Sequence, residues 1–132
     1  MEKQFFLFLN KSFKKVGEIM LPGSFMDLNE YIRVERMNKY AAAVVKLNET
    51  NRVKMECLGK KKIDLPVFLV FEWYVKDKRR DKDNIAFSKK FILDGLVAAN
   101  VIENDNFKSL IGFLDLFYVS VDQKVVISFY KF

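Results

Sequence analysis

The 132-residue sequence contains no histidine, one cysteine and two prolines. The absence of histidine excludes His-based zinc sites, catalytic pairs of histidine with serine or cysteine, and nucleases whose general base is histidine. The single cysteine, Cys57, cannot form an intrachain disulfide, which suits a reducing cytoplasm. Because no base is at hand to activate its thiol, Cys57 is interpreted as a small apolar residue on a helix.

Long hydrophobic runs are also missing from the chain. No stretch approaches the roughly 20 apolar residues that a membrane span requires. The apolar segment 4–9 is too short for the core of a signal peptide, and no small-residue cleavage site follows it. We therefore expect a cytoplasmic protein without a membrane segment.

The composition is otherwise that of a folded protein that carries excess positive charge. Hydrophobic residues make up 51% of the chain and 14 residues are phenylalanine, which is ample material for a core. The length predicts one domain that spans residues 1–132. The 23 basic and 17 acidic residues give a net charge of +6, which favours a polyanionic partner such as nucleic acid.

The pattern along the chain predicts an α+β domain, in which two main helices pack on a mixed sheet. Helices are expected over 30–58, with a break near 48–51, and over 85–99. Asn29 looks like the start of the first helix, with Asp27 as the competing cap. Strands are expected over 4–9, 16–21, 66–75, 111–120 and 124–132, the last two forming a hairpin around Asp122-Gln123.

Residues 76–84, here called the carboxylate loop, carry eight charges in nine positions and must therefore lie at a surface. Asp81 and Asp83 would point to the same side of an extended backbone. Asp105 follows the next predicted helix, in a loop expected to return beside them. Three neighbouring carboxylates would repel one another unless a hard cation such as Mg²⁺ bound them. Taken alone, however, D-x-D is a weak motif, and a solvated turn in which Asp83 or Asn84 caps the next helix is the plainer interpretation.

Basic residues surround these carboxylates along the sequence. Such a setting suits phosphodiester hydrolysis, because cations dock the polyanion while carboxylates hold a metal that activates water. The basic residues are Lys76, Lys78, Arg79, Arg80, Lys82, Lys89, Lys90 and Lys108.

Residues 80–105 resemble the signature of the RusA family of Holliday junction resolvases. RDKDN at 80–84 is similar to the family's R-D-x-D-N, KFILDGL at 90–96 to its K-x-x-x-D-x-L, and VIEND at 101–105 to the segment that ends in an acidic pair. Two features depart from the pattern. Three extra residues separate Asn84 from Lys90. If this segment is helical, the family's spacing and the longer spacing found here place the lysine on nearly the same helix face, from which Lys89 would point away. Asn104 stands where many members have the first aspartate of the pair.

The resemblance implies that Asp81, Asp83 and Asp105 hold the metal and that Lys90 is the catalytic lysine. It implies Mg²⁺, with Mn²⁺ as an alternative, no organic cofactor, a homodimer, and four-way DNA junctions as substrates in recombination and repair. The longer spacing is similar to that of the Gram-positive phage branch, so the host would be a bacterial cell. Asp94 matches an acidic residue that recurs in the family, and we do not count it among the metal ligands. The resemblance, together with the positive charge of this region, predicts the following DNA-binding residues: Arg80, Arg79, Lys78, Lys82, Lys89 and Asn29.

Two alternatives of different kinds remain open at the level of sequence. The first is a nuclease of the same fold that acts on other branched DNA, such as forks or flaps. The second is a non-catalytic, basic nucleic-acid-binding module, which would need neither the aspartates nor a divalent ion. A structural or partner-binding protein has no positive support in the sequence.

Overall fold

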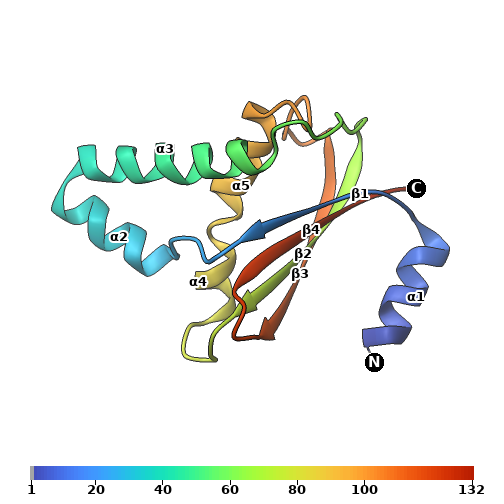
Figure 1. Cartoon of the computed structure of the whole chain (residues 1–132), viewed down its shortest axis with the longest axis horizontal. Helices are drawn as coiled ribbons and strands as arrows, with labels where there is room; N and C mark the ends of the chain where they lie inside the picture. Colours follow the sequence, from blue (N-terminus) through green and yellow to red (C-terminus); the bar gives the residue numbers. More distant parts are fainter. Residues whose placement is uncertain (1) are drawn as a thin grey trace.

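The computed structural model describes residues 2–132 and contains one four-stranded mixed sheet with helices around it (Figure 1). The strand order is β1-β4-β2-β3, in which β2 and β3 are parallel and the other two pairs are antiparallel. The predicted α+β class and mixed sheet are confirmed. The elements are α1 (Glu2–Ser12), β1 (Lys14–Pro22), α2 (Leu28–Met37), α3 (Lys39–Glu56), β2 (Val67–Val75), α4 (Lys82–Ala86), α5 (Lys89–Ala98), β3 (Leu110–Val119) and β4 (Lys124–Lys131).

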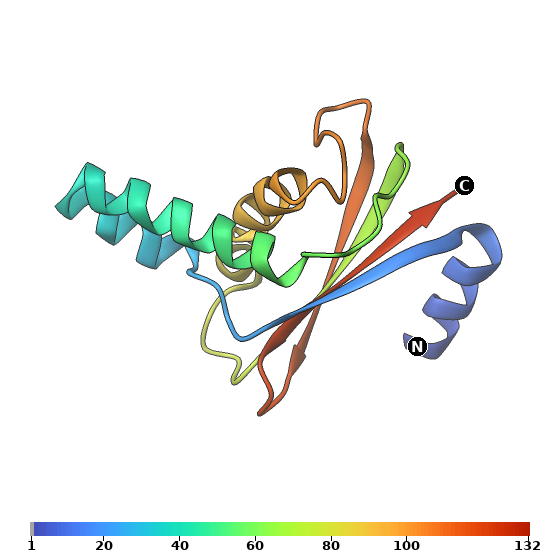
Figure 2. The same ribbon diagram turned by 45° about the horizontal axis from the view of Figure 1, so that its top comes forward.

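The main core lies between the sheet and the helices α3 and α5 (Figure 2). β2 is an inner strand, rich in β-branched and aromatic residues, and was predicted correctly over 66–75. Leu69, Phe71 and Trp73 are every second residue of this strand, so their side chains all point to the face that α3 and α5 cover, and each is at most 2% exposed. Burying one such side chain contributes about 1.5–3 kcal/mol, so this strand anchors the segment that follows it.

The N-terminal segment 4–9 was predicted to be a strand, and this prediction is wrong. It belongs to the helix α1, because a short continuous apolar run cannot be assigned by periodicity alone. Phe5 and Leu9, four residues apart, pack with Val70 and Tyr130 on the sheet face opposite α3 and α5. α1 therefore covers a second, smaller apolar cluster.

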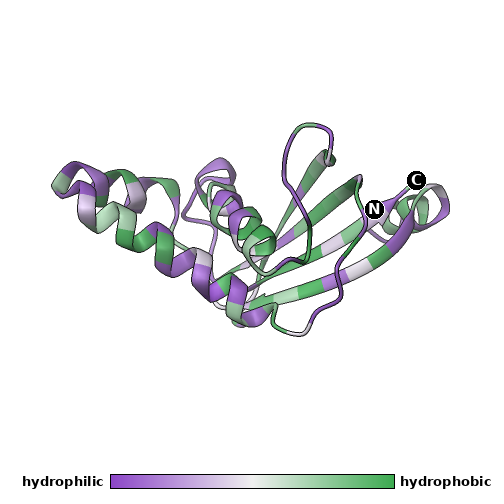
Figure 3. Ribbon diagram, turned by 90° about the horizontal axis from the view of Figure 1, so that it is seen from above, coloured by the Kyte–Doolittle hydropathy of each residue, from purple (hydrophilic) through white to green (hydrophobic). Residues whose placement is uncertain are grey.

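The helical segment after residue 27 is divided at a different place from the predicted one. The break lies at Asn38 rather than near 48–51, because the Asn38 side chain caps α3 by accepting from the backbone N–H of Tyr40 at 2.9 Å. Asp27, and not Asn29, caps α2. The two helices form an arm, residues 28–56, which packs on the core at the C-terminal end of α3, through Val53, and otherwise extends away from the sheet (Figures 1 and 3). The predicted helix 85–99 is likewise two helices, α4 and α5.

The predicted hairpin between the last two strands is also wrong. β3 and β4 do not pair with each other, because β2 lies between them. The connection 120–123 crosses the end of β2, where the backbone N–H of Ser120 donates to the carbonyl of Val75 at 2.8 Å. β3 pairs in parallel with β2 through the α4–α5 crossover and remains an edge strand of the sheet.

Candidate functional site

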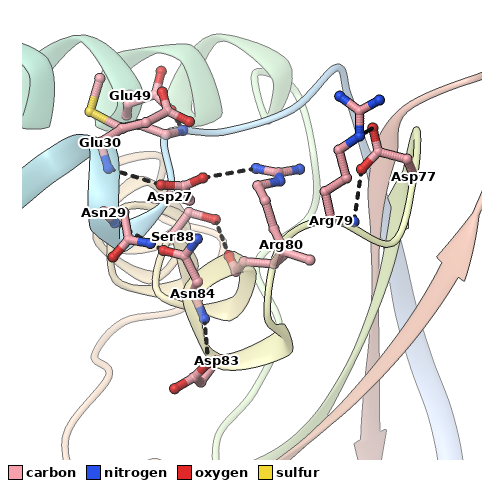
Figure 4. Close-up of polar contacts among 12 residues, drawn as sticks. Asp27, Asn29, Glu30, Glu49, Asp77, Arg79, Arg80, Asp83, Asn84 and Ser88 are labelled. Atoms are coloured by element: carbon pink, nitrogen blue, oxygen red, sulfur yellow. Dashed lines mark hydrogen bonds and ion pairs between the residues drawn. The ribbon is translucent and has the colours of Figure 1, made fainter.

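The carboxylate loop leaves the C-terminal end of β2 and is held to α2 by an internal ion pair (Figure 4). Nη1 of Arg80 lies 3.4 Å from Oδ2 of Asp27, whose side chain is only 5% exposed. Burial alone would raise the pKa of Asp27. The hydrogen bond from the Glu30 backbone and the nearby Arg80 outweigh it, so the pKa of Asp27 is lowered. Asp27 is therefore an ionised partner that turns Arg80 inward.

A second contact ties the same loop to the same helix. Asn84 is 6% exposed, and its Oδ1 accepts from the backbone N–H of Asn29 at 2.9 Å. That N–H is one of the donors at the start of α2 that have no partner within the helix. Together with the Arg80–Asp27 pair, this bond holds the part of the loop that contains Asp81 and Asp83 on both sides.

Asp81 and Asp83, in contrast, are both exposed. Asp81 occupies the cap position of α4 without a side-chain capping bond, and Oδ1 of Asp83 accepts from the backbone N–H of Asn84 at 2.9 Å. The predicted extended backbone is wrong here, because α4 begins at Lys82. Figure 4 shows the Asp83 carboxylate pointing away from the Asp27–Arg80 pair. The two carboxylates thus flank the first residue of a helix and face solvent.

Asp105 lies at the other end of the sheet from these two aspartates. The carboxylate loop follows β2, whereas Asp105 precedes β3, and the two strands are parallel. A strand of nine residues, such as β2, spans about 30 Å. In Figure 1 the segment before β3 is at the top and the carboxylate loop at the bottom. The expectation that Asp105 returns beside Asp81 and Asp83 is wrong within one chain.

The geometry also bears on the predicted metal. Among residues 2–132, no three His, Cys, Asp or Glu side chains lie close enough together to hold an ion. Asp81 and Asp83 supply hard oxygen donors of the kind Mg²⁺ prefers, and both follow the same end of β2, whereas Asp105 precedes β3 at the other end of the sheet. The three-aspartate metal site therefore stays a prediction.

Lys89 is tied into the sheet. Its Nζ lies 2.6 Å from Oδ2 of Asp115 and 4.8 Å from the centre of the Phe113 ring, and its side chain is 17% exposed. Asp115 also accepts from Nε1 of Trp73 at 2.9 Å. Sequence reasoning missed Asp115, although a lone acid within an apolar strand is a signal of a paired, partly buried carboxylate.

Lys90, the next residue, is the accessible lysine. It pairs with Asp94 one helical turn later, at 3.2 Å, and its side chain is 60% exposed. An exposed pair of this kind contributes at most about 1 kcal/mol and is easily exchanged for another anion. Of the two lysines, Lys90 is thus the one that an incoming phosphate can reach.

Some of the remaining basic residues of the carboxylate loop border a groove of about 360 Å³ at the same end of the sheet. Lys78 and Lys82 line it together with Arg80, and Phe117 forms part of its apolar wall. Arg79 lies on the surface, 89% exposed, with Nε 3.9 Å from Asp77. This edge of the sheet therefore combines exposed carboxylates with several cations.

No protein-family model matches the chain, and the curated proteins contain no match to it either. The likeness to the resolvase family therefore rests on the motif in residues 80–105 and stays a prediction. Within the part of the chain that is described, no helix is both long enough and apolar enough to cross a lipid bilayer.

Proposed function

We propose that this chain is a Mg²⁺-dependent, structure-specific endodeoxyribonuclease that resolves Holliday junctions by paired, symmetric nicks. The observation that supports the proposal best is that the carboxylate loop contains two kinds of side chain, those that anchor it and those that stay exposed. Arg80 and Asn84 turn inward and anchor the loop to α2, while Asp81 and Asp83 stay exposed. Exposed carboxylates on an anchored loop, among cations, suit a site that binds a metal and a phosphodiester together.

In this proposal the chain's residues have separate roles. Asp81 and Asp83 would hold Mg²⁺, which when bound supplies an activated water and stabilises the leaving oxygen. Lys90 would steady the charge of the scissile phosphate. Lys78 and Lys82 would contact the DNA backbone from the groove beside the loop. Lys89 and Arg80, predicted as DNA contacts, would act chiefly by keeping α5 and the loop in position.

We further propose a homodimer in which a second copy supplies Asp105. β3 is an edge strand, and its Ile111 and Phe113 side chains are 43% and 42% exposed. If two β3 strands paired antiparallel about a two-fold axis, Asp105 of one copy would approach the carboxylate loop of the other. The dimer would then contain two equivalent sites, one for each strand that a resolvase cuts.

The first experiment incubates the protein with a mobile four-way junction or a linear duplex, in Mg²⁺ or in EDTA. Symmetric cutting of the junction alone, only with Mg²⁺ and not by Asp83→Asn, is the expected result. If the junction is bound but never cut with Mg²⁺ or Mn²⁺, the proposed activity is wrong.

A second experiment tests whether the site is shared between copies. Asp83→Asn and Asp105→Asn proteins are each expected to be inactive, but mixed subunits should recover nicking. Mixing creates one site with both wild-type aspartates, so a single nick per junction is expected rather than full resolution. A mixture that remains inactive, while subunit exchange is demonstrated with tagged chains, rules out the shared site.

A second candidate function is a non-catalytic nucleic-acid-binding module. The observation that favours it is the absence of a three-acid cluster within residues 2–132. Such a module would bind DNA equally well after Asp81→Asn and in EDTA. A third, related candidate cuts forks or flaps, which a panel of branched substrates would reveal. In each case we propose that the protein acts in the cytoplasm of a bacterial cell, encoded by the host or by a phage.

A further inference from the structure

The helix α2 presents an unusual surface for an element attached to a core. None of its ten residues is buried. Its start is nevertheless firmly positioned, because Asp27 binds Arg80 and Asn29 binds Asn84, the residue next to Asp83. α2 therefore extends outward from the carboxylate loop along the arm, in a fixed direction (Figures 1 and 4).

One side of α2 carries a row of polar and cationic side chains. Asn29, Arg33 and Arg36 follow each other at spacings of four and three residues, which places them on one helix face. They border a groove of about 480 Å³, with Ile32 and Met37 as its apolar part. The row begins beside Asn84 and runs away from the carboxylate loop.

The opposite side of α2 faces the domain. The Tyr31 ring lies 5.4 Å from that of Phe87 and 5.8 Å from that of Phe91, centre to centre. At about 100° per residue, Arg33 and Arg36 lie roughly opposite to Tyr31 on the helix. The two arginines consequently have no role in packing α2 onto α4 and α5.

The arginines of the arm are of two kinds. Arg52 donates to the carbonyls of Pro22 and Ser24 at 2.7 and 2.8 Å, and lies over the Phe25 ring. Arg33 and Arg36 are exposed and form no ion pair or side-chain hydrogen bond with residues 2–132. Arg52 is thus a structural residue, whereas the other two keep their donors available to a ligand.

We propose that the Asn29–Arg33–Arg36 face of α2 binds the phosphate backbone of the DNA arm that leaves the cutting site. The planar guanidinium group matches phosphate oxygens in a two-point geometry, and two such groups one helical turn apart can follow a backbone. The inference rests on the proposed function for the identity of its ligand. It adds a binding surface outside the carboxylate loop and assigns that surface to arginines that the family signature does not contain.

The test measures binding of a four-way junction, without divalent ions, over a range of salt concentrations. Arg33→Gln/Arg36→Gln is compared with Lys3→Gln/Lys11→Gln, which makes the same charge change on exposed positions of α1. We expect the arginine variant to bind at least about tenfold more weakly and its log–log salt slope to fall by about 2. The Lys3/Lys11 control should stay within about threefold of wild type. Arg33→Lys/Arg36→Lys keeps both charges but loses the two-point geometry, so it should keep the wild-type salt slope and bind more weakly than wild type.

The outcomes separate this inference from the proposed function. If the arginine variant matches the Lys3/Lys11 control in affinity and slope, while the wild type binds and cuts junctions, only the α2 surface is disproved. If the wild type binds no DNA at any salt concentration, both proposals fail. Far-ultraviolet circular dichroism provides the folding control, and because both arginines are exposed, the variant should retain the wild-type spectrum and melting curve.

Discussion

Oδ1 of Asn84 accepts a hydrogen bond from the backbone N–H of Asn29 at 2.9 Å, across 55 positions of sequence. Asn84, the last residue of the R-D-x-D-N string, thus accepts a hydrogen bond from a backbone donor in the first turn of α2, which belongs to the arm. This bond and the Arg80–Asp27 pair make the geometry of the carboxylate loop depend on α2. The stability of the arm and the function of the loop should therefore be linked.

Replacing Asn84 should separate these two elements. Asn84→Ala removes a buried acceptor and leaves the Asn29 N–H without its partner, so the free energy of unfolding should fall by about 1–2 kcal/mol. Urea denaturation followed by circular dichroism measures the change. Asn10→Ala, at an exposed position of α1, is the matched control and should change stability by less than about 0.5 kcal/mol. Equal stabilities for the two variants would show that the bond does not hold the arm.

The same substitution at the neighbouring residues Lys89 and Lys90 should affect stability to different extents. Lys89→Gln removes the cation beside the partly buried Asp115, which should lower the free energy of unfolding by about 1–3 kcal/mol. Lys90→Gln removes only an exposed pair and should change it by less than about 0.5 kcal/mol, while it reduces junction cutting. Thermal melting and a nicking assay on both variants provide the comparison. A stable Lys89→Gln protein with lost activity would instead make Lys89 the functional lysine.

At Gly95, α5 lies in close contact with α3. A Cβ atom added there would lie 2.4 Å from Cβ of Val53 and 2.9 Å from the backbone oxygen of Thr50. Gly95→Ala should therefore destabilise by about 2 kcal/mol or more, although alanine is normally preferred to glycine within a helix by about 1 kcal/mol. Gly59→Ala is the contrast, since φ is +79° and no atom lies within 4 Å, so only backbone strain of about 1 kcal/mol is expected. Urea denaturation would contradict this account if Gly95→Ala were the more stable of the two.

Glu72 should give the protein a measurable dependence of stability on pH. Burial raises the pKa of Glu72 above its ordinary value of 4.5, and the hydrogen bond from Tyr74 only partly offsets this. The folded state therefore binds the proton more tightly than the unfolded state. The stabilisation is present below pH 4.5 and is lost as pH rises through the folded pKa.

At pH 7 the charged form of Glu72 opposes folding, so Glu72→Gln should raise the melting temperature there. Its advantage over wild type should shrink as the pH falls toward 4.5. Melting curves between pH 4 and 8 measure the difference, with the exposed Glu56→Gln as a control that should show little change. An advantage that is constant over the whole pH range would mean that titration of Glu72 is not its cause.

Much of the local structure could be predicted because its causes are local. The β-branched and aromatic run at 66–75 predicts a strand in any context, and eight charges in residues 76–84 cannot be buried. The helix formers between Asp27 and Gly59 predict helical structure for the same reason. What failed at this level were segments whose local signals were ambiguous: the apolar run 4–9, which helix or strand can bury equally, and the helix boundary at Asn38.

The chain's own sequence determined that a charged loop with Asp81 and Asp83 follows a buried strand and lies at the surface. The tertiary structure alone decided that Arg80 and Asn84 turn inward to α2, and that Asp105 lies at the far end of the sheet. The reason is that strand pairing is non-local. Because β3 joined β2 in parallel and β4 took the other side of β2, the loop before β3 was carried away from the loop after β2.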